Sequence, residues 1–261
     1  MTAPDVSLVL PAYDSADYIG ASVASCLEFF ERHGLQGEVI VADDGSSDGT
    51  HQLVPQGERV KVVRLEANRG KGAGLRLGMS AATGRLRVFT DADLPYGLEP
   101  LLLARTFIEQ RGFHAVIGDR TMPGSTYQSV GPARRVLSEA ASLAFRTLVT
   151  GGIFDTQCGF KAFRGDVADE LFRISRVDRF AVDVELIYLL LKYRLDIKRI
   201  PVRLERNASS SVHVVRDSLR SVVDITHIRL NWARDRYRSP VLEGILAADL
   251  SADETDARKN S

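Results

Sequence analysis

Short apolar runs alternate with helical patterns along the first half of the chain. Residues 6–10 form a β-branched and aliphatic run, and residues 16–32 follow with apolar side chains at the spacing of one helix face. Further apolar runs lie at residues 39–42, 60–65, 86–89 and 115–117. Helical or turn-like segments between them include residues 70–82 and 99–110. This alternation predicts an α/β fold, in which a mostly parallel sheet carries helices on both faces.

Polar residues cluster where three of these strands end. The clusters cover residues 11–15, 43–50 and 91–93. In an open α/β sheet, ligands bind beyond the carboxyl ends of the strands. We therefore expect the three clusters to meet in one crevice.

The second half of the chain has a different pattern. A helical pattern at residues 134–149 precedes a stretch rich in glycine, cysteine and aromatic residues at 155–163, and another helix is predicted near 182–193. We expect these segments to close the crevice. Because the end of the chain is polar and lacks periodicity, we expect one domain over residues 1–240 and a disordered tail over 241–261.

Composition narrows the functional classes. Lysine plus arginine equal aspartate plus glutamate at 34 each, so no overall charge attracts the chain to nucleic acid. Cys26 and Cys158 lie outside any metal-binding or redox motif, which fits reduced thiols in the cytoplasm. The longest apolar stretch, near residues 184–191, is too short to cross a bilayer, and residues 1–5 lack the features of a signal peptide. We expect a cytoplasmic protein, either soluble or peripheral at the cytoplasmic face of a membrane.

Two carboxylates, Asp91 and Asp93, follow the strand at residues 86–89 with one residue between them. Such a pair can bind Mg²⁺ or Mn²⁺ together with the oxygens of a diphosphate. Acidic residues after a strand are also common in plain solvated turns. The sequence therefore predicts either a divalent metal site or a polar turn at this strand end.

Other strand ends carry groups suited to a nucleotide. Asp43 is placed to accept hydrogen bonds from a base or ribose, whereas residues 46–50 fit a turn and a helix cap. Residues 68–72 open a helix, where backbone N–H groups and cationic side chains suit a phosphate. A plain N-terminal turn explains residues 68–72 equally well.

Four motifs, in this order, resemble those of family 2 glycosyltransferases, which have the GT-A fold. Residues 11–14 resemble the PAYN motif, residues 43–50 match DDGSxDGT, residues 68–72 match NxGKG and residues 91–94 match DADL. The resemblance extends over residues 6–202. It implies an inverting, metal-dependent transfer of a sugar from a UDP- or GDP-sugar to an acceptor.

The acceptor is indicated by a further segment. Residues 155–161 read Asp-Thr-Gln-Cys-Gly-Phe-Lys and look like a segment of dolichyl-phosphate glucosyltransferases, which are related to dolichyl-phosphate mannose synthases. This resemblance makes a polyprenyl phosphate one candidate acceptor. Ser211 stands where those relatives carry a lysine, which keeps a soluble hydroxyl acceptor as the alternative. A nucleotide-sugar binding protein without activity is a third possibility, and intact Asp91 and Asp93 oppose it.

The resemblance also implies roles for individual residues. Those expected to bind the nucleotide sugar are Pro11, Ala12, Tyr13, Asp43, Lys71, Asp91, Ala92 and Asp93. Asp91 and Asp93 are the expected ligands of Mg²⁺ or Mn²⁺. Arg120, Arg134 and Ser138 are expected to bind the acceptor phosphate and the sugar phosphates.

The base that would deprotonate a hydroxyl acceptor is expected to be Asp183 or Asp155. Asp183 equally fits a stabilising charge in the first turn of a helix. If the acceptor is an ionised phosphate, neither carboxylate has to act as a base. The sequence leaves these alternatives open.

A basic helical pattern precedes the tail. Apolar side chains recur at helical spacing within residues 212–238, among six arginines. The pattern predicts a helix packed on the domain with a solvated basic face. The alternative is a peripheral contact with anionic lipid.

Overall fold

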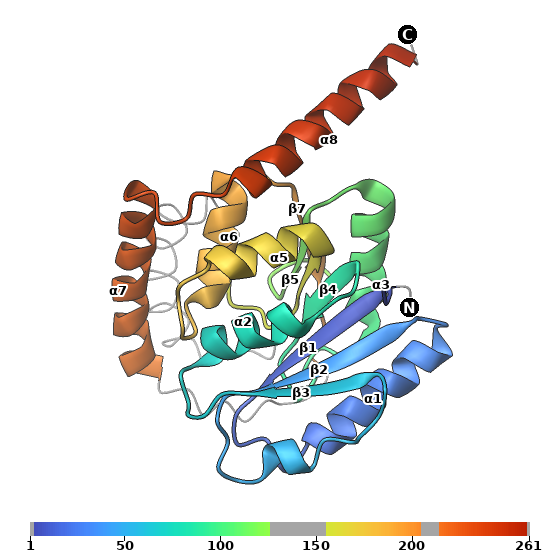
Figure 1. Ribbon diagram of the computed structural model, residues 1–261, viewed down its shortest axis with the longest axis vertical. Helices are drawn as coiled ribbons and strands as arrows, with labels where there is room; N and C mark the ends of the chain where they lie inside the picture. Colours follow the sequence, from blue (N-terminus) through green and yellow to red (C-terminus); the bar gives the residue numbers. More distant parts are fainter. Residues whose placement is uncertain (1–2, 126–154, 205–213, 260–261) are drawn as a thin grey trace.

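A seven-stranded sheet runs through the part of the chain that the computed structural model describes, residues 3–125, 155–204 and 214–259 (Figure 1). Its strands are β1 Val6–Ala12, β2 Gly37–Asp43, β3 Val60–Arg64, β4 Leu86–Phe89, β5 Ala115–Asp119, β6 Lys161–Arg164 and β7 Ile197–Pro201. They lie in the order β3-β2-β1-β4-β6-β5-β7. β6 runs antiparallel to β4 and β5, and the other neighbouring pairs are parallel.

The five strands predicted from the apolar runs are confirmed, each within two residues of its predicted bounds. Strands β2, β1 and β4 are parallel neighbours, so their carboxyl ends lie at one edge of the sheet. β6 and β7 were not predicted, because they are short and carry charged residues within the strand. The expected α/β fold with a mostly parallel sheet is therefore correct, and one antiparallel strand is added to it.

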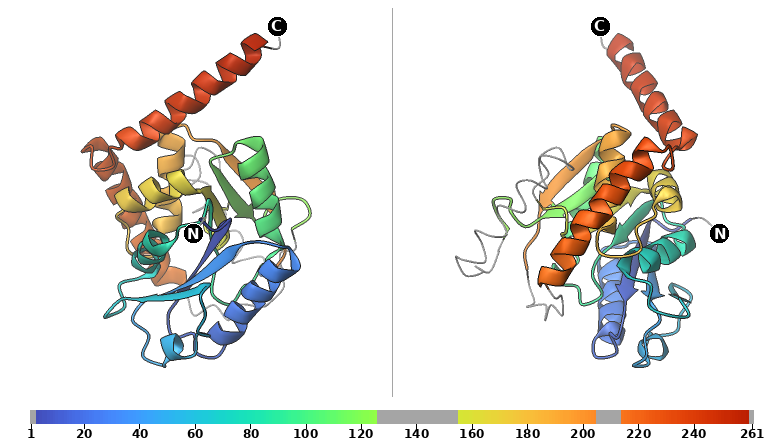
Figure 2. Two further views of the ribbon diagram at one scale, coloured as in Figure 1. Left: turned by 45° about the vertical axis from the view of Figure 1, so that its right-hand side comes forward. Right: turned by 90° about the vertical axis from the view of Figure 1, so that its left-hand side faces the viewer.

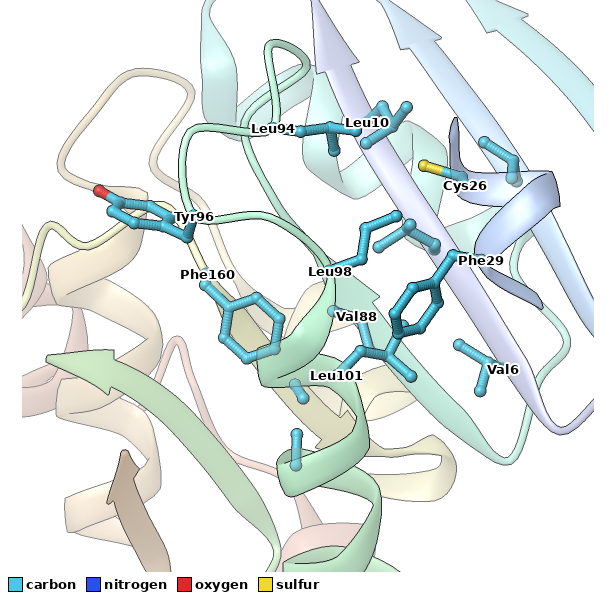
Figure 3. Packing of buried hydrophobic residues seen from close by; sticks show 14 of the residues in the cluster. Val6, Leu10, Cys26, Phe29, Val88, Leu94, Tyr96, Leu98, Leu101 and Phe160 are labelled. Carbon is cyan, nitrogen blue, oxygen red and sulfur yellow. The ribbon is translucent and has the colours of Figure 1, made fainter. Parts of the chain in front are cut away.

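Helices cover both faces of this sheet. They are α1 Ile19–Arg32, α2 Lys71–Ala81, α3 Glu99–Arg105, α5 Gly165–Ile174, α6 Val182–Lys192, α7 Val214–Ala233 and α8 Pro240–Lys259, with a 3-10 turn at Thr50–Gln52 and a π-helical turn at Thr106–Gln110. Side chains alternate across a strand, so Leu8 and Leu10 of β1 pack with α1 and α3 (Figure 3). Val9, between them, packs on the opposite face with α2, α5 and α6.

Residues 240–259 form helix α8, whereas a disordered tail was expected over residues 241–261. Leu242 in its first turn is buried, and Ile245 packs against the same apolar cluster as α5 and α6. One turn further on, a carboxylate oxygen of Asp249 accepts hydrogen bonds from Nε2 of His114 at 2.7 Å and from Arg164 at 3.0 Å. These contacts hold the start of α8 on the domain, and its far end extends beyond the other elements (Figure 2).

The basic segment near the end forms helix α7, as predicted. Ile225 and Ile228 on one side of α7 are buried, and Trp232 packs edge-on against Tyr188 and Tyr193. None of the helices within the described residues is both long enough and apolar enough to span a bilayer. The helix predicted at residues 134–149 lies outside the described residues.

Candidate active site

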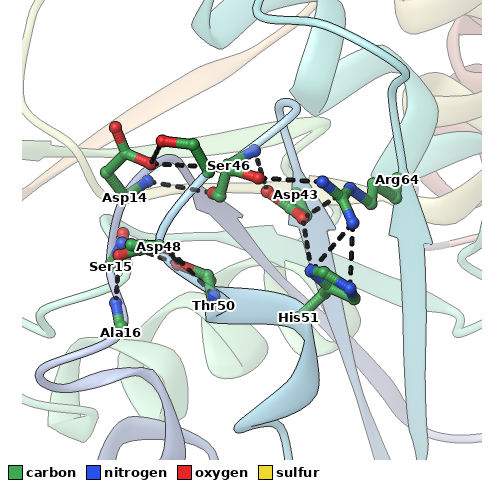
Figure 4. Close-up of polar contacts among 10 residues, drawn as sticks. Asp14, Ser15, Ala16, Asp43, Ser46, Asp48, Thr50, His51 and Arg64 are labelled. Atoms are coloured by element: carbon green, nitrogen blue, oxygen red, sulfur yellow. Dashed lines mark hydrogen bonds and ion pairs between the residues drawn. The ribbon is translucent and has the colours of Figure 1, made fainter.

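The loops that follow β1 and β2 are joined by side-chain to backbone hydrogen bonds (Figure 4). The backbone N–H of Asp14 donates to Ser46 Oγ at 2.9 Å, and the carboxylate of Asp14 accepts from the backbone N–H of Ser47 at 2.9 Å. Asp48 accepts from the backbone N–H of Ala16, also at 2.9 Å. The 46–50 segment therefore has the structural role that its turn pattern suggested, and it fixes the end of β1. Tyr13 projects from this end and is half exposed.

Asp43 is the last residue of β2 and is fully buried. Its Oδ1 accepts from the backbone N–H of Ser46 at 2.9 Å. Its Oδ2 lies 3.2 Å from Nε of Arg64 and 3.6 Å from Nδ1 of His51 (Figure 4). The distance to Arg64 is that of an ion pair, yet Oδ2 accepts no hydrogen bond from the described residues. One oxygen of Asp43 thus keeps its capacity to accept a hydrogen bond, and its contact with a nucleotide stays a prediction.

The neighbouring Asp44, which the sequence analysis did not single out, positions the start of α2. Its two carboxylate oxygens accept from the backbone N–H groups of Arg69 and Gly70 at 2.8 and 2.7 Å. Gly70 has a φ of +113°, and a side-chain carbon there would lie 2.5 Å from the backbone oxygen of Asp178. Asp44 and Gly70 therefore set where α2 begins, and Lys71 is its first residue.

Lys71 lies between two acidic side chains. Its Nζ donates to Oδ1 of Asp91 at 2.8 Å and lies 3.6 Å from Oδ2 of Asp183. Asp91 comes from the loop after β4, and Asp183 from the first turn of α6. Two residues predicted from separate motifs, Lys71 and Asp91, are thus brought into direct contact.

The charges in this group stabilise one another. Burial opposes the charged form of Lys71, but the carboxylates of Asp183 and Asp91 outweigh it and hold the pKa of the ammonium above its ordinary value. Burial likewise opposes ionisation of Asp91, and the ammonium of Lys71 outweighs it, so the pKa of Asp91 is lowered. Asp91 is therefore a carboxylate at neutral pH, with a side chain that is 39% exposed.

Asp183 is enclosed on its other side by Lys161. Nζ of Lys161, the first residue of β6, donates to Oδ1 of Asp183 at 2.5 Å and to the backbone oxygen of Cys158 at 2.9 Å. The side chain of Asp183 is only 4% exposed, and that of Lys161 only 1%. Both oxygens of Asp183 thus face ammonium groups. Neither predicted role of Asp183, as a base or as a stabilising charge in a helix, includes these lysines.

The second predicted base is also paired. Both carboxylate oxygens of Asp155 accept hydrogen bonds from the guanidinium of Arg120 at 2.8 Å, and Oδ2 also accepts from the backbone N–H of Arg120 at 2.9 Å. Burial opposes ionisation of Asp155, but these hydrogen bonds outweigh it and lower its pKa. The nearby Cys158 is buried in the same apolar cluster as Phe160, and this burial raises the pKa of its thiol to about 11. Asp155 positions Arg120, which stands directly after β5.

The backbone of Gly159 lies close to the carboxylate of Asp91. A side-chain carbon at Gly159 would lie 1.9 Å from Oδ2 of Asp91. The glycine of the 155–161 segment therefore leaves room for the carboxylate. No role was predicted for Gly159 or Lys161, because the pairing of β6 with β4 is what brings both residues next to the site.

Pro11 and Ala12, which were also expected to bind the nucleotide sugar, are the last two residues of β1, and Ala12 is buried. Ala92 is buried and Asp93 is half-buried in the loop after β4. Among the residues described, no group of three or more histidine, cysteine, aspartate or glutamate side chains converges as a metal site. Arg134, Ser138 and Ser211 lie outside the described residues. The site therefore brings together Lys71, Asp91 and Asp183, with Arg120 and Asp155 as an adjoining pair.

Comparisons with known proteins agree with the motifs. Residues 7–172 match the family described as Glycosyl transferase family 2. A dolichyl-phosphate beta-glucosyltransferase of Drosophila melanogaster is 32% identical, over 76% of this chain and 66% of that protein. The Homo sapiens protein of the same name is 28% identical, over 89% of this chain and 77% of that protein. The chain thus spans about two thirds to three quarters of these relatives.

Solved structures with the same arrangement of elements are glycosyltransferases as well. Mannosyl-3-phosphoglycerate synthase of Rubrobacter xylanophilus has a TM-score of 0.65 at 20% identity, over 91% of this chain and 78% of that one. Glucosyl-3-phosphoglycerate synthase of Mycobacterium tuberculosis, crystallised with Mn²⁺ and UDP, has a TM-score of 0.64 at 19% identity, over 85% and 78%. At these identities the likeness concerns the fold. Together with the family match over residues 7–172, it identifies the chain as a glycosyltransferase of family 2 with the GT-A fold.

Proposed function

We propose that the protein transfers glucose from UDP-glucose to the phosphate of a polyprenyl phosphate, with inversion at the anomeric carbon and with Mg²⁺ or Mn²⁺. Glucose and the lipid phosphate follow from the dolichyl-phosphate beta-glucosyltransferases to which the chain is similar. The choice of UDP is supported by glucosyl-3-phosphoglycerate synthase of Mycobacterium tuberculosis, which was crystallised with UDP-glucose and Mn²⁺. The observation that carries the acceptor assignment is the ion pairing of both predicted bases.

A base for a hydroxyl acceptor needs an accessible carboxylate oxygen. Both oxygens of Asp155 are held by Arg120, and both oxygens of Asp183 face lysine ammonium groups. An ionised phosphate already carries a nucleophilic oxygen and needs no base. The pairing therefore favours a phosphate acceptor over a hydroxyl acceptor.

The donor set at the end of β4 fits a divalent cation. Asp91 is ionised and partly exposed, and Asp93 lies two residues further along the same loop. Two carboxylates leave several coordination positions for diphosphate oxygens and water, which is how Mg²⁺ is usually bound in such sites. Bound there, the cation would neutralise negative charge on the departing nucleoside diphosphate.

The chain's own residues contribute positioning and charge. Asp43 and Tyr13 lie at the two strand ends where the base and ribose are expected. Lys71 holds a positive charge beside Asp91, where the diphosphate of the leaving group would lie. Arg120, oriented by Asp155, would bind the acceptor phosphate, the role that the family resemblance also implies for Arg134 and Ser138. A phosphate oxygen held in line with the anomeric carbon would displace UDP and invert the configuration.

The test is transfer of labelled glucose from UDP-glucose to a polyprenyl phosphate in detergent, with Mn²⁺. The matched acceptors are the same polyprenol without its phosphate and phosphoglyceric acid, a soluble acceptor. We expect product only with the polyprenyl phosphate, and a β-linkage by NMR. Transfer to phosphoglyceric acid, or equal transfer to the bare polyprenol, would contradict the proposal. A parallel reaction with GDP-mannose in place of UDP-glucose tests the choice of donor.

A lipid-linked acceptor requires the protein to approach a membrane. Helix α7 packs on the domain through Ile225 and Ile228, while Val223 and Leu230, seven residues apart, are exposed on another side. Arg229 is exposed beside Leu230. Exposed apolar side chains next to arginine suit an interface with anionic lipid. We propose this side of α7 as a peripheral membrane contact.

Cosedimentation with liposomes tests this contact. We expect more protein to bind vesicles with anionic lipid than neutral vesicles, and the difference to shrink at high salt. Leu230→Ser should weaken binding, and Val241→Ser, at an exposed apolar position on α8, is the matched control. Equal binding to both vesicle types would leave α7 with a packing role only.

A further inference from the structure

The ammonium group of the buried Lys161 and that of the largely buried Lys71 lie close to the ring of Phe89, the last residue of β4. Nζ of Lys161 is 5.4 Å from the ring centroid and Nζ of Lys71 is 5.8 Å from it. Lys161 reaches this position because β6 pairs with β4 so that Lys161 lies directly opposite Phe89. Aromatic faces attract cations, but the attraction is small beside the cost of burying an ammonium group without a counter-charge. Each lysine therefore depends on a carboxylate.

Asp183 supplies that carboxylate to both lysines. Lys161, Asp183, Lys71 and Asp91 form a row of alternating charge, with separations of 2.5, 3.6 and 2.8 Å between successive groups. Exposure rises along the row, from 1% for the Lys161 side chain to 12% for Lys71 and 39% for Asp91. The row thus runs from the core to the position where the donor diphosphate is expected.

The buried end of the row is more than a packing device. Hydrophobic residues of similar volume usually stabilise a core as well as a buried ion pair does. The Lys161–Asp183 pair has one effect that such residues could not reproduce. It holds the carboxylate of Asp183 near Lys71. We propose that Lys161 and Asp183 are positioning residues that hold the Lys71 ammonium where it binds the donor diphosphate, an inference that rests on the proposed nucleotide-sugar donor.

Removing either charge would move Lys71. Without Lys161, the carboxylate of Asp183 would have Lys71 as its nearest cation and would draw it inward, away from Asp91. Without the charge on Asp183, Lys71 would pair with Asp91 alone. In both cases the ammonium leaves its position between the two carboxylates, and the diphosphate loses a contact that the nucleoside does not make.

The experiment compares UDP with uridine. Calorimetric titration in Mn²⁺ gives the dissociation constant of UDP, and competition gives that of uridine, for the wild type, Lys161→Met and Asp183→Asn. We expect UDP to bind about tenfold more weakly to each variant, as for a lost charged hydrogen bond, with uridine changed less than twofold. Arg87→Met is the matched control, because it removes a buried cation from β4 at a position opposite Phe163 of the same β6. This control should leave the ratio of the two constants unchanged.

A double-mutant cycle separates positioning from a general structural role. In a Lys71→Met background, Lys161→Met should cause no further loss of UDP affinity. If Lys161→Met does not fold, Lys161→Met combined with Asp183→Asn removes both buried charges and should show the same tenfold loss. Equal weakening of UDP and uridine, or a further loss in the Lys71→Met background, would overturn the inference. A wild-type protein that binds neither UDP nor GDP would instead overturn the proposed donor.

Discussion

Replacing Gly159 with alanine places a methyl group against the carboxylate of Asp91. The added carbon would lie 1.9 Å from Oδ2 and 2.5 Å from Cγ of Asp91, whereas ordinary contacts begin near 3.4 Å. The carboxylate must therefore move by about 1.5 Å. Displacing a reacting group by 1 Å can lower a rate by on the order of a hundredfold. That factor corresponds to about 2.7 kcal/mol of activation free energy.

The fold should tolerate the same change. Gly159 has no positive φ, so alanine can adopt its backbone conformation. The displaced atoms are the far end of a side chain that is 39% exposed and can rotate into solvent. The variant loses the hydrogen bond between Lys71 and Asp91, for which we expect about 1 kcal/mol of unfolding free energy. Gly159→Ala should thus separate activity from stability.

The assay measures kcat/KM for glycosyl transfer together with the thermal unfolding midpoint. Gly57→Ala is the control, because its added carbon would meet nothing closer than a Val60 methyl group at 4.0 Å. We expect Gly159→Ala to lose activity about a hundredfold and Gly57→Ala to behave as wild type. A folded Gly159→Ala variant with wild-type kcat/KM would refute the assignment of Asp91 to the reacting centre.

Three further predictions concern single carboxylates. Activity should require a divalent cation, and Asp93→Ala should lower it at least about a hundredfold while the protein still folds; full turnover in excess EDTA would contradict this. Asp43→Asn should raise KM for the donor about tenfold with little change in kcat, and steady-state kinetics showing the reverse split would exclude a ground-state contact. Asp155 has a lowered pKa in the folded protein, so its contribution to stability is present above about pH 4 and is lost as the pH falls through the folded value. Denaturant unfolding should show Asp155→Asn destabilised by about 2 kcal/mol at pH 7 and by less at pH 3, and an equal deficit at both would mean that the charge is unimportant.

The positions of the residues expected to bind the donor could be predicted because they depend on local sequence. Asp43 ends the apolar strand β2 and Asp91 follows the apolar strand β4, and parallel strands place their carboxyl ends at one edge. Lys71 opens a helix whose start is set by the 68–70 segment and by Asp44. Each of these placements follows from a pattern within a few residues, together with one rule about parallel sheets.

The roles of the other acidic residues could not be predicted in this way. Asp183 matched a motif for a base, but its partners Lys161 and Lys71 come from β6 and α2. Asp155 is held by Arg120, 35 residues earlier in the chain. β6 itself has four residues with a charge at each end, so periodicity does not reveal it. β6 pairs antiparallel with β4, and this pairing depends on contacts between segments far apart in the sequence. It brings Lys161 and Gly159 to the site.

The charge balance of the site gives a physical reason for combining a metal with a diphosphate. Four of its carboxylates each have a cationic partner within 3.2 Å: Asp43 with Arg64, Asp91 with Lys71, Asp155 with Arg120 and Asp183 with Lys161. These pairs leave little net charge to attract a donor that carries two negative charges. A divalent cation bound with the donor brings two positive charges, so the pair can enter without disturbing the existing balance. An acceptor phosphate adds negative charge that this cation does not offset, which is why Arg134, the arginine predicted on the acceptor side that is not among these pairs, matters to the proposal.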